Sequence, residues 1–353
     1  MTSVVQTGCL FGVRAHGVRV EASPIRGLPG LDLVGLPEAG IREGRVRVLA
    51  ALRNSGFEVP EQRFVVNFAP ADLRKSGSSF DLAIAVALLA QFGLCAPNRL
   101  DDTLIVGELS LDGGLRPVRG LLSHLLSARE RGLRSALIPR ADSSGGKLVT
   151  GVELHCAETL LEAVAFLGGE RHLPGPSAAL AVASTDDGRL PDLRDVRGQH
   201  AARRALEVAA AGEHGLLMVG PPGAGKTMLA QRLPTLLPPP SPEEALAIAT
   251  IASVSGFGTG RLAPSARPFR APHHSCSDVA LIGGGDPIRP GEVTLAHGGV
   301  LFLDELPELR RSALEALRPT MESGFACVVR ARDRVVMPAQ PLIVAAMNPC
   351  RCG

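Results

Sequence analysis

The stretch that decides the fold is Leu216-Leu-Met-Val-Gly-Pro-Pro-Gly-Ala-Gly-Lys-Thr-Met-Leu229. Its first four residues are apolar and predict a short buried strand, and the loop from Gly220 to Thr227 fits the pattern G-x-x-x-x-G-K-T. Glycines in such a loop let successive backbone N–H groups point inward, where they bind the β- and γ-phosphates of a nucleotide. With a helix expected to begin near Lys226, the stretch predicts the phosphate-binding turn of a parallel α/β sheet rather than a mere Gly/Pro-rich turn.

The polar residues of this loop each have a chemical task. The ammonium of Lys226 places a positive charge on the phosphates, and the hydroxyl of Thr227 is a ligand for Mg²⁺. Lys226 is one of three lysines among the 37 basic residues, which makes its position in the loop more specific. Gln199, before a helix expected over 199–211, is a weaker candidate for the adenine pocket. The predicted ATP-binding residues are Gly220, Pro221, Pro222, Gly223, Ala224, Gly225, Lys226, Thr227, Met228 and Gln199.

A second apolar run, Gly299-Val-Leu-Phe-Leu303, is followed by two carboxylates, Asp304 and Glu305. Parallel α/β sheets bind ligands at the carboxyl ends of their strands, so both are expected beside the phosphate-binding loop. We assign Asp304 to Mg²⁺, chiefly through water, and Glu305 to the attacking water as general base. A third strand expected over 342–347 ends at Asn348, a candidate for the γ-phosphate and the water. The alternative for the carboxylates is a strand end followed by a solvated acidic turn.

Arginines mark a second kind of candidate site. Arg330, Arg332 and Arg334 alternate between two valine pairs, which predicts a β-hairpin with an arginine-rich tip. In a ring of subunits such tips would line the pore, and a phosphate backbone would be their natural partner. Arg267 and Arg270 are further candidates for the same groove. A solvated charged turn explains the hairpin equally well.

Metal-ligand residues are few. Adjacent histidines seldom face one metal, so we expect His273-His274 to pack in a loop or near the nucleotide. Cys350 and Cys352 are half of a possible four-cysteine zinc site, which is incomplete in this sequence.

Composition bounds the class of protein. The 353 residues are 45% hydrophobic and 20% charged with a net charge of +2, which excludes a disordered chain and a bulk polycation. Seven cysteines are scattered without a signal peptide before them, and the best apolar run, 82–90, is too short to span a membrane. We therefore expect a reduced, cytoplasmic protein.

Two composition shifts divide the chain. Before about residue 173 the pattern mixes a strand expected over 63–68 with an apolar helix expected over 80–92. Residues 173–190 are small and polar and indicate a linker. From 191 onward strands alternate with helices, which predicts a parallel sheet. The expected domains are therefore residues 1–172 and 191–353.

The second domain resembles AAA+ ATPases of the magnesium-chelatase-like group, specifically the ComM/YifB family. The resemblance extends through almost all of residues 195–353. The stretches that carry it are 198–199, 220–229, 267–274, 281–285, 289–292, 295–297, 299–307 and 345–350.

The first domain is similar to the family's N-terminal domain, which resembles the proteolytic domain of Lon, an α+β fold of the ribosomal S5 domain 2-like type. The markers are residues 70–75, 77–85 and 107–110. Lon uses a serine activated by a lysine. Ser79 falls at the serine position, but Leu122 falls at the lysine position and cannot accept a proton. We therefore expect a non-proteolytic scaffold.

The resemblance implies a hexameric motor that hydrolyses ATP with Mg²⁺ and acts on single-stranded or branched DNA, as in branch migration during natural transformation. It also places Asn348 as a sensor of the γ-phosphate. The family pattern continues with further cysteines, an arginine finger, a second sensor arginine and a helical lid. From this sequence we expect a truncated chain that hydrolyses ATP poorly, because an arginine finger is worth roughly 10³–10⁵ in rate. A chelatase-type motor for metal insertion, an ATP-dependent protease and a non-functional fragment are the alternatives.

Overall fold

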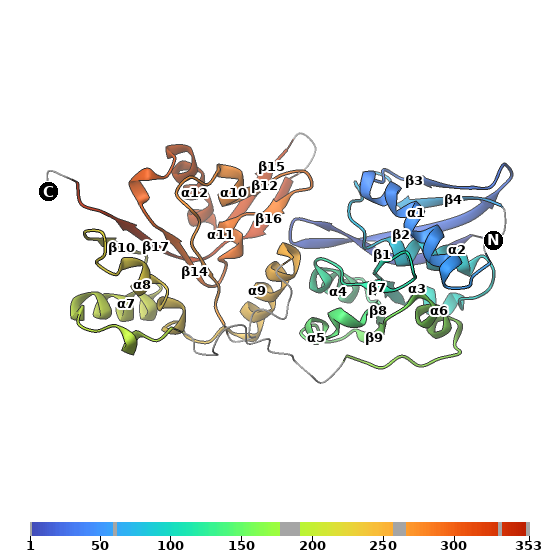
Figure 1. Cartoon of the computed structure of the whole chain (residues 1–353), viewed down its shortest axis with the longest axis horizontal. Helices are drawn as coiled ribbons and strands as arrows, with labels where there is room; N and C mark the ends of the chain where they lie inside the picture. Colours follow the sequence, from blue (N-terminus) through green and yellow to red (C-terminus); the bar gives the residue numbers. More distant parts are fainter. Residues whose placement is uncertain (1, 59–61, 177–190, 257–265, 331–333, 351–353) are drawn as a thin grey trace. The chain divides into compact units, whose positions relative to one another are not determined.

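The computed structural model describes residues 2–58, 62–176, 191–256, 266–330 and 334–350. The chain divides into two compact units, residues 1–181 (unit 1) and 182–353 (unit 2), and each contains its own sheet (Figure 1). Across the described parts, no helix has both the length and the apolar character that a membrane crossing requires.

Unit 1 is organised around a seven-stranded mixed sheet. Its strands are β1 (Ser3–Phe11), β2 (Arg14–Ile25), β3 (Gly30–Val34), β4 (Arg63–Ala69), β5 (Thr103–Ile105), β8 (Ser135–Pro139) and β9 (Glu153–Ala157). Their order in the sheet is β3-β4-β2-β1-β5-β8-β9. The long hairpin β1–β2 and the pair β2–β4 are antiparallel, whereas β1–β5, β5–β8, β8–β9 and β3–β4 are parallel.

The core of unit 1 confirms the expected strand and helix. The strand predicted over 63–68 is β4, and the apolar helix predicted over 80–92 is α2, Asp81–Ala90, in which every residue from Asp81 to Leu89 is buried. A helix that is apolar on all sides belongs inside a domain, because no face gains from water contact. The other elements are α1 (Ala39–Asn54), α3 (Pro97–Asp101), α4 (Leu121–Glu130), α5 (Ser143–Gly146), α6 (Leu160–Gly168) and the hairpin β6 (Glu108–Leu109) and β7 (Leu115–Arg116).

Unit 2 contains the predicted parallel sheet. Its strands are β10 (Leu216–Val219), β11 (Phe269–Arg270), β14 (Val300–Leu303) and β17 (Leu342–Met347), in the order β10-β17-β14-β11, and every neighbouring pair is parallel. Its helices are α7 (His200–Gly212), α8 (Lys226–Ala230), α9 (Pro242–Ser255), α10 (Asp278–Ile282), α11 (Glu292–Leu295) and α12 (Arg311–Ser323). Two hairpins complete it, β12 (Gly283–Gly284) with β13 (Arg289–Pro290), and β15 (Phe325–Val329) with β16 (Arg334–Pro338).

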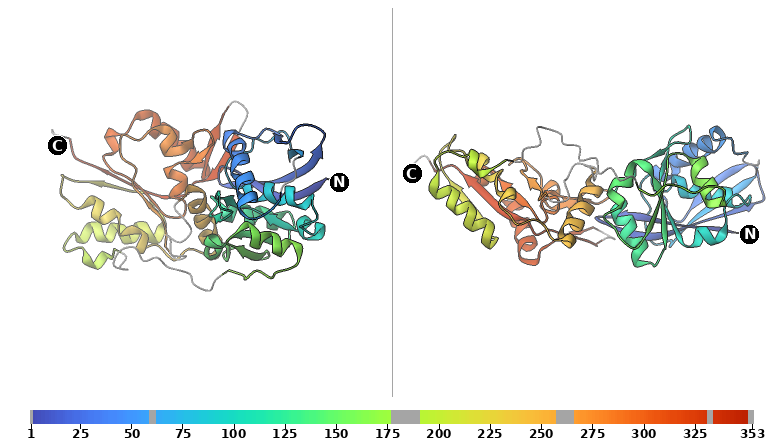
Figure 2. Two further views of the ribbon diagram at one scale, coloured as in Figure 1. Left: turned by 45° about the vertical axis from the view of Figure 1, so that its right-hand side comes forward. Right: turned by 90° about the horizontal axis from the view of Figure 1, so that it is seen from below.

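Helices cover both faces of this sheet (Figures 1 and 2). Phe302 and Val344 pack with α7 and α8, whereas their neighbours Leu303 and Ala345 pack with α10, α11 and α12. Burial on both faces explains why β14 and β17 are continuous apolar runs without polar alternation. β10 is an edge strand in which Leu217 and Val219 are more than half exposed, so the prediction that it is a buried strand was wrong.

The end of α7 differs from expectation by one residue. Gly212, one residue beyond the helix expected over 199–211, is its last helical residue, and Glu213 takes the left-handed conformation at φ 53°.

Candidate nucleotide-binding site

Three parallel strands end at one edge of the unit 2 sheet. Val219 is opposite Met347, and Leu303 is opposite Ala345, so the residues that follow β10, β14 and β17 emerge side by side. These residues are Gly220, Asp304 and Asn348. The edge therefore collects the phosphate-binding loop, the first carboxylate and the amide that the sequence predicted, as expected for the ligand-binding end of a parallel sheet.

The loop has the backbone that its glycines predict. Gly223 and Gly225 have φ of 80° and 84°, and nothing lies within 4 Å of a Cβ built on either. The requirement for glycine is therefore conformational rather than steric. Gly225 caps α8, which begins at Lys226 as predicted.

Lys226 and Asn348 meet at this edge. The Nζ of Lys226 donates to the carbonyl oxygens of Gly220 at 2.7 Å and Pro221 at 3.1 Å, and to Oδ1 of Asn348 at 2.9 Å. The ammonium is thus held over the loop, and all its donors face oxygen atoms. Phosphate oxygens are stronger acceptors for these donors than neutral carbonyls are.

Thr227 and Asp304 form a second pair. The Thr227 hydroxyl donates to Oδ2 of Asp304 at 3.2 Å, across 77 residues of sequence. A hydroxyl and a carboxylate side by side are oxygen ligands of the type that Mg²⁺ prefers, with the remaining positions filled by water and phosphate. These two residues therefore fit the predicted metal.

Glu305 is held by a residue that the sequence did not single out for it. Its backbone is left-handed at φ 50°, and its N–H donates to Oδ1 of Asp304 at 2.9 Å. Its Oε2 lies 2.7 Å from Nδ1 of His274. A non-glycine residue in this conformation is uncommon and is typical of functional sites. His274 was expected only to pack near the nucleotide, and the contact depends on strand register, which the sequence alone does not give.

Gln199 lies against the loop. Its backbone is left-handed at φ 53°, and its Nε2 donates to the carbonyl oxygen of Ala224 at 3.3 Å. Met228, on the first turn of α8, is exposed. Both predicted residues are therefore at the loop, and the adenine contact of Gln199 stays a prediction.

Arg267 and Arg270 have other partners than the expected DNA. The Arg267 guanidinium is only 8% exposed and donates to the carbonyl oxygens of Pro238 and Gly298 and to Glu244. Arg270 makes a two-pronged ion pair with Glu292 at 2.6 and 2.7 Å. Both guanidinium groups have partners inside unit 2, and the expected DNA contact at these two positions stays a prediction.

The arginine hairpin forms as predicted. β15 and β16 pair antiparallel, with Val328 opposite Val335 and Val329 opposite Arg334. Arg330 and Arg334 are exposed at the end of the hairpin, and Arg332 lies outside the described residues. The predicted contact surface therefore retains two described arginines.

The described residues contain no cluster of three or more metal-ligating side chains. The His273 ring accepts from the Ser275 N–H at 3.3 Å, and its centroid lies 4.1 Å from that of the His274 ring. Cys350 is exposed, and Cys352 lies outside the described residues.

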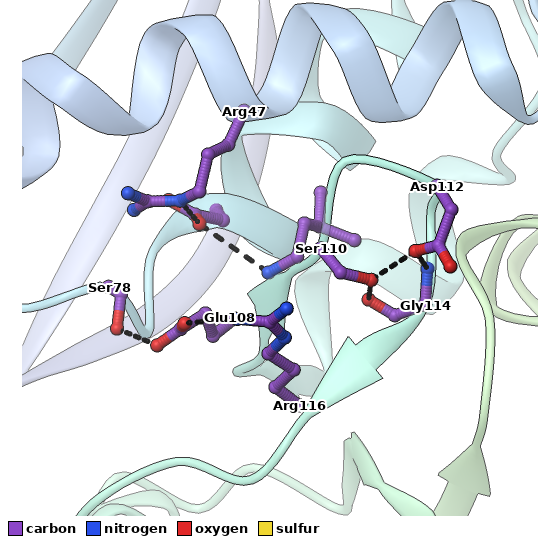
Figure 3. A network of polar contacts seen from close by, with 9 residues as sticks. Arg47, Ser78, Glu108, Ser110, Asp112, Gly114 and Arg116 are labelled. Carbon is purple, nitrogen blue, oxygen red and sulfur yellow. Dashed lines mark hydrogen bonds and ion pairs between the residues drawn. The ribbon is translucent and has the colours of Figure 1, made fainter.

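In unit 1, the position of the Lon lysine is part of the core. Leu122 is completely buried in α4, so no proton acceptor stands there. Ser78, the residue before Ser79, donates a hydrogen bond to the carboxylate of Glu108, which also forms an ion pair with Arg116 (Figure 3). Ser78 therefore donates to a carboxylate that also faces an arginine of the β6–β7 hairpin.

The chain resembles known proteins over nearly its whole length. Residues 192–353 match the family model described as magnesium chelatase, subunit ChlI, and residues 20–142 match the model described as subunit ChlI of Mg-chelatase. Over 351 residues it is 45% identical to the uncharacterized protein YifB of Escherichia coli, covering 99% of this chain and 69% of YifB. It is 43% identical to the competence protein ComM of Haemophilus influenzae over 354 residues, again 99% of this chain and 69% of ComM.

A shorter match concerns Lon. The chain is 28% identical to Lon protease 2 of Bacillus subtilis over 146 residues, which are 39% of this chain and 26% of that protein. Together, the two magnesium-chelatase models and the near-complete matches to YifB and ComM show that this chain belongs to the ComM/YifB family of magnesium-chelatase-like AAA+ proteins.

Proposed function

We propose that this protein is an ATP-driven motor that remodels DNA, by branch migration or strand separation. One observation supports ATP hydrolysis above all others: Lys226, Thr227, Asp304, Glu305 and Asn348, from three separate stretches of chain, meet at the carboxyl edge of one parallel sheet. Phosphoryl transfer needs positioning and charge neutralisation more than covalent chemistry, and these residues supply both.

In this proposal each residue has one task. The backbone N–H groups of residues 223–227 and the Lys226 ammonium bind the phosphates, and Asn348 moves from Lys226 to the γ-phosphate. Thr227 and Asp304 hold Mg²⁺, which neutralises charge on the phosphate oxygens when bound. Glu305 accepts the proton of the attacking water.

The DNA contact rests on charge and geometry. Arg330 and Arg334 are exposed at the end of a two-stranded hairpin, and an arginine that reaches a phosphate displaces bound counterions. A homo-hexameric ring would bring six such hairpins around one strand of DNA. Its place in the cell would be the cytoplasm, where DNA and ATP meet.

A chelatase-type motor is the second candidate, because residues 192–353 match the model of a magnesium chelatase subunit. In that case ATP hydrolysis would depend on a partner protein that carries a tetrapyrrole, and DNA would have no effect. A protease is disfavoured, since the buried Leu122 stands where Lon needs a lysine.

The deciding experiment measures ATP hydrolysis with and without forked DNA, on this chain and on the full-length gene product. Stimulation by DNA that is lost in Lys226→Ala supports the motor. Lys147→Ala, which removes a lysine of unit 1, is the matched control and should leave the rate unchanged. Hydrolysis that ignores DNA and responds to a porphyrin-binding partner would overturn the DNA motor in favour of the chelatase.

A further inference from the structure

The contact between His274 and Glu305 follows from strand register. β11 and β14 are parallel neighbours, and Arg270 is opposite Leu301. His274 and Glu305 each come four residues after one member of this pair, so two short connections of equal length bring them to the same level beyond the sheet. There Nδ1 of His274 lies 2.7 Å from Oε2 of Glu305.

The loop that carries His274 is fixed on both sides. Before it, the two-pronged ion pair with Glu292 anchors Arg270 at the end of β11. Around it, the N–H of Ser275 donates to Nδ1 of His273 at 3.3 Å, and the N–H of Cys276 donates to the carbonyl oxygen of His273 at 2.9 Å. A side chain held by a fixed loop can fix its partner in turn, as supporting residues do around catalytic groups.

The two carboxylates after β14 have different partners. Asp304 faces Thr227 with one oxygen and accepts the N–H of Glu305 with the other. The Glu305 side chain is 47% exposed, so it would otherwise be free to rotate in water. An ion pair this exposed contributes little to folding stability. Its effect is therefore on the direction in which the Glu305 carboxylate points.

We propose that His274 is a positioning residue for Glu305: its Nδ1–H holds the carboxylate in the one orientation from which it can accept a proton from the attacking water. This inference rests on the proposed role of Glu305 as the general base. His274 itself touches neither nucleotide nor metal in this proposal.

Three substitutions of His274 separate positioning from packing. In asparagine the side-chain amide nitrogen is separated from Cβ by the same number of bonds as Nδ1 of histidine. In glutamine the amide nitrogen is one bond further away, at the distance of Nε2 of histidine. We expect kcat for ATP to fall about 10- to 100-fold in His274→Ala and His274→Gln, with KM and nucleotide affinity unchanged within twofold. His274→Asn should recover kcat to within about threefold of wild type. The matched control is His214→Ala, at an exposed histidine that precedes β10 at the opposite edge of the sheet, which should stay within twofold.

Two outcomes would overturn the positioning role. If His274→Asn is as slow as His274→Ala, the Nδ1–H bond is not what matters. If His214→Ala is equally slow, the loss of rate in His274→Ala does not come from the contact with Glu305. All assays use the full-length gene product with ATP and Mg²⁺.

A second measurement does not depend on turnover. The ¹⁵N shifts of the nine histidine rings report which nitrogen carries the proton. We expect His274 to carry it on Nδ1 in the wild type and to change to the Nε2–H form in Glu305→Ala, while His273 keeps its shifts. Unchanged His274 shifts in Glu305→Ala would refute the pairing. An inactive wild type that shows the pairing would instead refute the proposed ATPase.

Discussion

Two of the three lysines, one in each unit, show how differently the two units use the same chemistry. In unit 1 the Nζ of Lys75 donates to the carbonyl oxygens of Gly35, at 2.9 Å, and Pro70, and the residue is completely buried. In unit 2 the Nζ of Lys226 also donates to two carbonyl oxygens, but it lies at an accessible edge and reaches Asn348. Burial lowers the pKa of Lys75. Because its side chain is completely buried, no substrate in solution can reach it.

The same contrast extends to the other polar groups. Asp81 and His124 of unit 1 are fully buried, while Asp304, Glu305 and Asn348 of unit 2 are partly or fully exposed. Each of these three contacts a residue from another stretch of chain, namely Thr227, His274 and Lys226 in that order. Buried polar groups serve the fold, and exposed groups that converge on one edge can be rearranged by a ligand. The comparison therefore supports unit 2 as the place of the proposed chemistry, and the scaffold role of unit 1 stays a prediction.

The largest expected effect tests the unit 2 edge. Glu305→Gln removes the proposed base but keeps a side chain of the same shape, so ATP hydrolysis should fall about 10²–10⁴-fold while ATP still binds. Turnover and binding of a fluorescent ATP analogue measure the two effects separately. Glu308→Gln, three residues further on in the short helix at Leu306–Glu308, is the control. Loss of ATP binding in Glu305→Gln would contradict the role of a base.

The second effect tests the buried groups of unit 1. Burial lowers the pKa of His124 to about 4, and neither ring nitrogen has a hydrogen-bond partner among the described residues. Because the pKa in the unfolded chain is near 6.5, the unfolded state binds the proton first, and stability is lost as the pH falls from about 6.5 to about 4. The full loss amounts to about 3 kcal/mol, at about 1.4 kcal/mol for each pKa unit.

His124→Leu should remove this dependence. Burial raises the pKa of Asp81, in spite of its ion pair with Arg47, and that of Asp142, each to about 6, and these carboxyls stabilise the fold as the pH falls. The difference between wild type and His124→Leu isolates the imidazole from these opposing groups. Hydrogen exchange of the β1 and β4 amides at pH 7 and pH 4.5 measures it. Equal losses in both proteins would mean that His124 is not buried as the neutral ring.

The third effect concerns the hairpin of unit 2. The double variant Arg330→Ala/Arg334→Ala should weaken DNA binding about tenfold, equally for all DNA sequences. The slope of the logarithm of the binding constant against the logarithm of the salt concentration should become shallower by about two, because two phosphate contacts are lost. Titration of labelled DNA at several salt concentrations gives both numbers. Arg318→Ala, which removes an exposed arginine of α12 paired with Glu322, is the control. If the double variant binds DNA with the same salt dependence as the wild type, the hairpin does not contact DNA and is a solvated charged turn.

The sequence predicts features that depend on neighbouring residues, and it does not predict contacts between segments that lie far apart along the chain. The strands over 216–219 and 342–347 were predicted to the residue, because each is an apolar run ended by a glycine or an asparagine. The phosphate-binding loop was equally clear, because its chemistry requires fixed spacing within eight residues. Local patterns of this kind are readable without tertiary structure.

Contacts between distant segments were not readable. The pairing of His274 with Glu305 depends on the register of β11 against β14, and sequence spacing does not give register. Arg267 and Arg270 were expected at a DNA groove because of their positive charge. Their ion pairs with Glu244 and Glu292 could not be predicted, because the sequence does not show which residues lie next to an arginine. The burial of Lys75 and Asp81 was likewise hidden, since charged residues are almost always predicted at the surface.

The smallest expected effect completes the test of unit 1. Ser79→Ala should change neither ATP hydrolysis nor stability measurably, and the wild type should leave casein intact. The reason is that a serine becomes a nucleophile only beside a proton acceptor, and the position that the acceptor takes in Lon is the buried side chain of Leu122. Ser78→Ala is the informative partner, because it breaks the bond to Glu108 (Figure 3) and should cost about 1 kcal/mol. Casein cleavage that is abolished by Ser79→Ala would instead give unit 1 an active site of its own, and the contrast between the two units would then be one of substrate rather than of scaffold and motor.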